Sequence, residues 1–92
     1  TNGSFSNMPK SVFTGAYKSF LGALRAARQD VDLSQTELAK RLGKEQPFVS
    51  LIERGVRRLD VIEFCVIAKA MGYDPTKLFD QITKQLPDDM DI

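Results

Sequence analysis

Histidine is absent from this sequence, and cysteine occurs once, at Cys65. A single cysteine cannot form an intramolecular disulfide, which favours a reduced compartment such as the cytoplasm. The chain also lacks the usual ligands of zinc, haem and iron–sulfur groups, so we expect no metal and no other cofactor. Ser-His-Asp and Cys-His catalysis are excluded for the same reason. Because no glycine-rich phosphate loop is present either, we do not expect an enzyme.

Long apolar runs are absent as well. No run approaches the roughly 20 residues that a membrane-spanning helix requires. Residues 1–10 lack the apolar segment of a signal peptide. The chain has 92 residues, of which 42% are hydrophobic. This length and composition predict one small domain without a membrane partner.

Neither sign of charge dominates, since the formal net charge is +1. The charges are nevertheless unevenly placed. Residues 18–58 include nine basic and five acidic side chains, whereas residues 59–92 include three basic and seven acidic ones. A basic block of this kind suggests a face that binds a polyanion. An ordinary mixed surface explains the same counts, so charge alone leaves both interpretations open.

The apolar periodicity predicts helices throughout and no strand. The first helix begins near Thr14 and ends at residues 30–32. Its expected buried face is formed by Tyr17, Phe20, Leu21, Leu24, Ala27 and Val31. The second helix starts after Ser34, which forms a capping box with Glu37, and stops at Gly43. Its expected buried stripe is Leu38, Ala39 and Leu42.

Three further helices are predicted. One spans 46–54, with Pro47 tolerated in its first turn. The next opens at Asp60 with a second capping box and ends at Gly72. Its expected inward positions are Val61, Phe64, Ile67, Ala68 and Met71, with Cys65 beside them as a small core residue. The last opens at Asp74, and its apolar positions are Leu78, Phe79 and Ile82.

These elements define the expected domain boundaries. We predict a flexible arm over residues 1–12, part of it left from cloning ahead of a native start at Met8. The folded domain spans 13–86. A loose tail covers 87–92, and we interpret its aspartates as solvated rather than as a metal site.

The second and third helices have the outline of a helix-turn-helix, with Ala39 small at the crossing and Gly43 at the turn. The sequence motifs LRAAR, LSQTELAKRLG, VSLIERGVRR and AKAMG lie between Leu24 and about Leu78. In these motifs the chain resembles the lambda-repressor/Cro-like family, also called the XRE family. The resemblance implies an all-α, five-helix bundle. It also implies a DNA-binding regulator that places the third helix in the major groove.

The resemblance also implies residue roles. The base-reading positions are Glu45, Gln46, Pro47, Phe48, Ser50 and Leu51. The phosphate-binding positions are Gln35, Lys44, Arg54, Arg57 and Arg58, with Lys40 and Arg41 as weaker candidates. Arg28 and Glu53 correspond to an ion pair that orients the third helix. Gln46 suits adenine because its amide can donate and accept at once.

Several positions depart from the family pattern. Lys44 and Glu45 replace an apolar residue and a Ser or Thr cap, whereas Pro47, Phe48 and Leu51 replace small or polar residues. Phe48 and Leu51 can contact thymine methyl groups. Phe48 can equally pack back on its own domain or against a protein partner. These departures leave base specificity open but do not affect the expected fold.

We therefore expect a sequence-specific repressor of bacterial or phage origin that binds double-stranded DNA in the cytoplasm or nucleoid. The expected assembly is a homodimer on a near-palindromic operator. Its contacts are assigned to the last helix and the end of the fourth, with Phe79 and Ile82 as main residues and Ile62 or Val66 as further ones. The alternative is a protein-interaction module on the same fold, such as an antitoxin.

Overall fold

The structure, a computed structural model, describes residues 15–90. Within this range the chain forms helices joined by short connections and contains no strand, which confirms the predicted all-α fold. The helices are α2 (Gly15–Asp30), α3 (Gln35–Leu42), α4 (Gln46–Glu53), α5 (Val61–Ala70) and α6 (Pro75–Thr83). None of them has the length and apolar character required to span a bilayer. The predicted arm at 1–12, the predicted start at Thr14 and residues 91–92 of the tail lie outside the described residues.

Local capping sets where the helices begin. Ser34 Oγ accepts a hydrogen bond from the Glu37 amide at 3.0 Å, and Glu37 Oε1 accepts one from the Ser34 amide at 2.9 Å. Asp60 and Glu63 form the same reciprocal box before α5. Both predicted capping boxes are thus confirmed. Gly43 closes α3 in the left-handed region at φ 69°, as expected for the turn of a helix-turn-helix.

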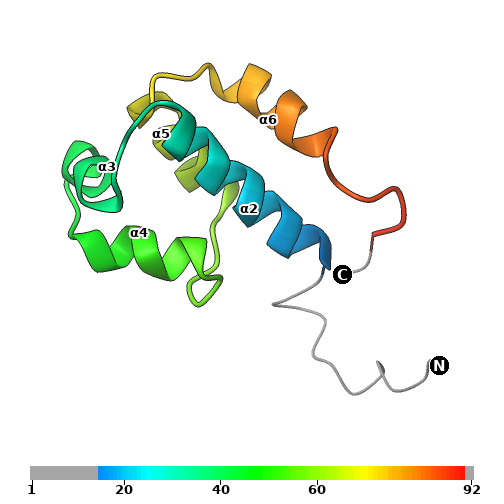
Figure 1. The fold of residues 1–92 in the computed structure, drawn as a ribbon, viewed down its shortest axis with the longest axis horizontal. Helices are drawn as coiled ribbons and strands as arrows, with labels where there is room; N and C mark the ends of the chain where they lie inside the picture. Colours follow the sequence, from blue (N-terminus) through cyan, green and yellow to red (C-terminus); the bar gives the residue numbers. More distant parts are fainter. Residues whose placement is uncertain (1–14, 91–92) are drawn as a thin grey trace.

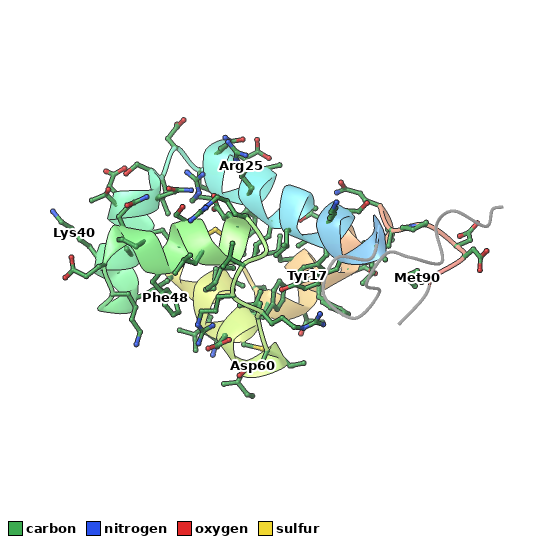
Figure 2. All side chains as sticks on the ribbon, turned by 90° about the horizontal axis from the view of Figure 1, so that it is seen from below. Tyr17, Arg25, Lys40, Phe48, Asp60 and Met90 are labelled. Carbon is green, nitrogen blue, oxygen red and sulfur yellow. The ribbon has the colours of Figure 1, made fainter. Side chains whose placement is uncertain are left out.

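Each helix from α2 to α6 contributes side chains to the core, and α2 packs against α4 and α6. Figure 1 shows α6 running beside α2 in the opposite direction, while α3 and α4 meet at the other end of the molecule. Ile52, Leu78 and Ile82 are the largest fully buried side chains. Figure 2 shows Arg25 of α2 and Asp60, the cap of α5, on opposite sides of the molecule. The outer faces of α2 and α5 therefore point in different directions.

Three expectations about which side chains are buried and which are available at the surface are wrong. Val31 is exposed because α2 ends at Asp30, so the helical repeat does not extend to it. Val61 is exposed because the buried face of α5 is formed by Phe64, Ile67 and Ala68, and Val61 lies on another side of the helix. Ile82 is only 1% exposed. It follows Leu78 by one helical turn, so both face the core, and Ile82 cannot be the predicted dimer contact.

Candidate nucleic-acid interface

The turn between α3 and α4 aims the outer face of α4 away from the core. The Lys44 amide donates to the carbonyl of Ala39 at 2.9 Å, which closes α3 and reverses the chain. Glu45 then takes the N-cap position with extended backbone, although its side chain makes no capping hydrogen bond. Val49 and Ile52 are buried under α4. The residues from Lys44 to Pro47 are exposed at its start.

A buried ion pair joins α2 to the end of α4. Arg28 is 6% exposed, and its guanidinium donates to both carboxylate oxygens of Glu53, at 2.7 and 3.0 Å. A further N–H of Arg28 donates to the Leu33 carbonyl at 2.6 Å. The two charges expected to pair from the sequence are therefore in contact. Bidentate geometry of this kind fixes the angle between two elements as well as their separation.

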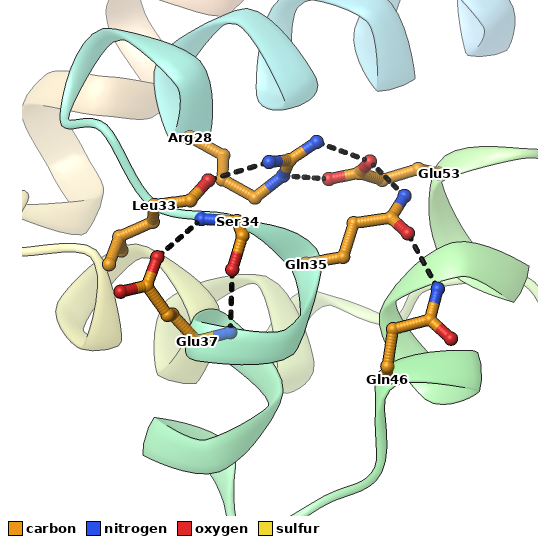
Figure 3. A network of polar contacts seen from close by, with 7 residues as sticks. All are labelled: Arg28, Leu33, Ser34, Gln35, Glu37, Gln46 and Glu53. Carbon is orange, nitrogen blue, oxygen red and sulfur yellow. Dashed lines mark hydrogen bonds and ion pairs between the residues drawn. The ribbon is translucent and has the colours of Figure 1, made fainter.

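The carboxylate of Glu53 continues this network toward the surface, as Figure 3 shows. Gln35 Nε2 donates to Glu53 Oε1 at 2.9 Å, and Gln46 Nε2 donates to Gln35 Oε1 at 2.8 Å. The direction of each bond follows from chemistry. An ionised carboxylate only accepts, so Gln35 must present its NH₂ group to Glu53 and its carbonyl to Gln46. Gln46 is therefore held with its own NH₂ group toward Gln35.

The two glutamines keep unused hydrogen-bonding groups. One N–H and the carbonyl oxygen of Gln46 have no partner among residues 15–90. One donor and one acceptor on the same amide are what the N7 and N6 edge of adenine requires. Gln35 has one N–H left, at the N-terminus of α3, where amide groups favour an anion. Both predicted roles are chemically available in this arrangement.

Phe48 occupies the opposite side of α4 from this network. Its ring is half-buried and packs against the core cluster. Lys44 Nζ lies 5.3 Å from the ring centre, and the guanidinium carbon of Arg57 lies 4.8 Å from it. Of the alternatives left open for Phe48, packing on its own domain is the one found in the structure. Its aromatic face is engaged by two cations.

Arg57 is also paired with an acid. Its guanidinium donates to the two carboxylate oxygens of Glu63, at 3.1 and 2.7 Å. The hydrogen bonds from Arg57, and next the Asp60 amide, lower the pKa of Glu63 to about 2. Glu63 likewise raises the pKa of Arg57. A phosphate contact by Arg57 would therefore have to compete with Glu63.

The remaining predicted contact residues differ in exposure. Glu45, Pro47 and Arg54 are exposed, whereas Ser50 and Leu51 are half-exposed on α4. Arg54 Nε donates to Ser50 Oγ at 3.2 Å, so these two residues form one polar group. The guanidinium carbon of Arg58 lies 4.6 Å from the centre of the Tyr17 ring. The weaker candidates Lys40 and Arg41 are exposed on α3, and Arg41 donates to the Ala70 carbonyl at 2.8 Å.

Sequence reasoning missed two contacts of this site. It did not anticipate the bond between Gln35 and Gln46, because these residues lie on different helices, α3 and α4, and only the turn between the helices brings them together. It also did not pair Arg57 with Glu63, although Glu63 was recognised as a capping residue. The signal for this second pair was an acid six residues after a basic loop position. Such a spacing becomes meaningful only when the intervening loop conformation is known.

Two comparisons match this chain to known proteins. The profile described as Helix-turn-helix matches residues 24–78, which is more than half of the chain. This chain is also similar to a solved structure, that of an XRE-family like protein from Pseudomonas syringae pv. tomato str. DC3000. The two chains are 41% identical in sequence, and their structures superpose with a TM-score of 0.72. The match covers 79% of this chain and 89% of that chain. No curated protein matches the sequence.

Proposed function

The chain belongs to the XRE family of helix-turn-helix proteins, and we propose that it is a repressor that reads double-stranded DNA with the outer face of α4. The single observation that carries this proposal is the orientation of Gln46. Its free N–H and carbonyl oxygen are held outward by a chain of hydrogen bonds that ends in a buried ion pair. A side chain held in one orientation loses little rotamer freedom on binding, so it discriminates between bases efficiently.

Basic side chains around α4 supply the contacts to phosphate. We assign this role to Lys44, Arg54 and Arg58, together with the free N–H of Gln35. Arg57 is secondary because its charge is already engaged by Glu63. Each phosphate contact releases counterions, so affinity falls as the salt concentration rises. A homodimer would place two copies of α4 in successive major grooves about 34 Å apart on a near-palindromic operator.

Two substitutions separate base reading from phosphate binding. After the preferred duplex is selected from a random DNA pool, Gln46→Ala should cost about 1–3 kcal/mol on that site and leave random duplex unaffected. Arg54→Ala should weaken both duplexes alike and reduce the salt slope by about one. Gln81→Ala changes an exposed glutamine on α6 and serves as the matched control. Equal losses on both duplexes for Gln46→Ala would contradict the assigned role.

The antitoxin-like alternative needs apolar anchors on α4. Phe48 and Leu51 are the candidates. The Phe48 ring packs against its own domain between Lys44 and Arg57, whereas Leu51 is half-exposed. A salt titration with random duplex distinguishes the two functions. Affinity that is nearly independent of salt would favour the protein-interaction module over the repressor.

A further inference from the structure

The outer face of α5 is an exposed apolar surface that DNA reading does not use. We define this face as Val61, Ile62, Cys65, Val66 and Lys69. Val61, Ile62 and Val66 are 76%, 71% and 51% exposed. Only two of the ten residues of α5 are charged, so the helix is apolar on nearly all sides. A helix with that composition is normally buried on all sides, yet residues 15–90 leave Val61, Ile62 and Val66 exposed, with Cys65 partly buried at the edge of the face.

Hollows lie on both sides of the outer face of α5. One has a volume of about 420 Å³ and is lined by apolar groups that include Tyr17, Phe20, Val61 and Phe79. The other has a volume of about 260 Å³, and its wall contains Phe48, Ile62 and Val66 together with the charged side chains Lys44, Arg57 and Glu63. The face is thus an apolar ridge between two hollows. When two copies meet around a two-fold axis, the ridge of each copy can fill a hollow of the other, because both copies use the same patch.

The charges at the two ends of α5 favour the same arrangement. Asp60 caps the start of the helix, and Lys69 lies in its last turn. When two copies of α5 pack in opposite directions, Asp60 of each copy approaches Lys69 of the other. The helix dipoles are then also antiparallel. Figure 2 shows Asp60 on the side of the molecule opposite Arg25, so α2 does not block approach to this end of α5.

We propose that the outer face of α5 is the surface through which two copies of this chain associate, α5 against α5 in opposite directions. This inference rests on the proposed function, which calls for a dimer. It centres the contact on α5, keeps Phe79 at the edge of the contact and removes only Ile82 from the sequence-predicted pair on α6. Ile82 is buried. The Phe79 ring centre lies 5.7 Å from that of Phe64 and 6.4 Å from that of Phe20, so Phe79 forms the wall of the hollow that receives the partner ridge.

Sedimentation equilibrium without DNA tests the proposal directly. Ile62→Glu places a charge at the centre of the contact, and we expect association to weaken at least about 30-fold, the effect typical of a central contact residue. Val31→Glu introduces the same charge at an exposed apolar position outside this face. It should leave the association constant unchanged. Circular dichroism and thermal melting should show that both variants fold like the unsubstituted chain.

Cys65 provides an independent readout of the geometry. It lies midway between Asp60 and Lys69 along α5, so a two-fold axis that pairs those ends passes close to it. A short bis-maleimide should therefore join two copies of the unsubstituted chain through Cys65 and fail with Ile62→Glu. A monomeric unsubstituted chain would overturn the proposal. So would a dimer that survives Ile62→Glu, or one that Cys65 does not cross-link.

DNA binding is measured separately, so that the two proposals can fail independently. Ile62→Glu should still bind a duplex with a single half-site, and it should lose only the cooperative binding to a duplex with two half-sites. If the chain dimerises through α5 but neither form binds DNA, the repressor function fails while the interface stands. If the unsubstituted chain binds both duplexes as a monomer, the interface fails while DNA reading stands.

Discussion

Replacing Glu53 by glutamine should strongly destabilise the domain. The Glu53 side chain is 6% exposed, and its carboxylate accepts hydrogen bonds from Arg28 and Gln35. Glutamine fills nearly the same volume but leaves the Arg28 guanidinium buried without an anionic partner. Breaking a buried pair in this way costs about 3–5 kcal/mol, a large share of the roughly 5–15 kcal/mol that stabilises a small domain.

Urea denaturation followed by circular dichroism measures this loss. With a denaturant slope typical of small proteins, the midpoint for Glu53→Gln should fall by about 2 M. Glu45→Gln removes an exposed carboxylate that makes no capping bond, and it is the matched control. It should change the unfolding free energy by less than about 0.5 kcal/mol. A loss below about 1 kcal/mol for Glu53→Gln would refute the argument from burial.

Removing both charges should restore most of the stability. Replacing a buried ion pair with apolar side chains is often neutral or stabilising by about 1–4 kcal/mol. The variant with Arg28→Met and Glu53→Leu still loses the hydrogen bond to the Leu33 carbonyl, which costs about 1 kcal/mol. We therefore expect a folded protein that is slightly less stable than the unsubstituted chain.

This doubly substituted variant also tests the function of the network. Without Glu53, Gln35 loses the acceptor that orients it, and Gln46 loses its fixed direction. Discrimination at the base read by Gln46 should fall by roughly 10-fold, because a bidentate contact contributes about 1–3 kcal/mol. Binding to random duplex should be unchanged. A folded double variant that keeps full discrimination would refute the idea that the ion pair orients Gln46.

Two further predictions concern the capping residues. Ser34→Ala removes the acceptor for the Glu37 amide, and urea unfolding should show a loss of about 1 kcal/mol. The Ser34 amide lowers the Glu37 pKa most and the Ser34 side chain next, so NMR titration of that variant, which keeps the amide, should show this pKa rising only part of the way back. Because the pKa of Glu63 is lowered from 4.5 to about 2, its pairing stabilises the fold above pH 4.5 and is lost as pH falls toward 2. The unfolding free energy of Glu63→Gln should therefore not show the loss that the unsubstituted chain shows between pH 4.5 and about 2. Because this substitution frees Arg57, binding to random duplex should become tighter and more salt-dependent.

The boundaries of the helices could be predicted because their causes are local. Ser34 and Glu37, like Asp60 and Glu63, are three residues apart, and their reciprocal bonds depend on little else. Burial in the first turn of α5 was harder to predict. Val61 is as apolar as its buried neighbours, and only the packing of Phe64 and Ile67 decides which side of the helix faces the core.

The candidate site depends on contacts across long stretches of sequence, and these explain the remaining differences. The sequence shows that Arg57 is basic. Only the fold shows that its guanidinium is paired with Glu63 and stacked on the Phe48 ring. The Arg57 amide also donates to the Leu51 carbonyl at 3.1 Å, so the loop is anchored to α4 itself. Phe48 and Arg57 therefore hold the basic loop against α4. If α4 reads DNA as proposed, apolar contact with thymine methyl groups falls to Pro47 and Leu51, beside the oriented amide of Gln46.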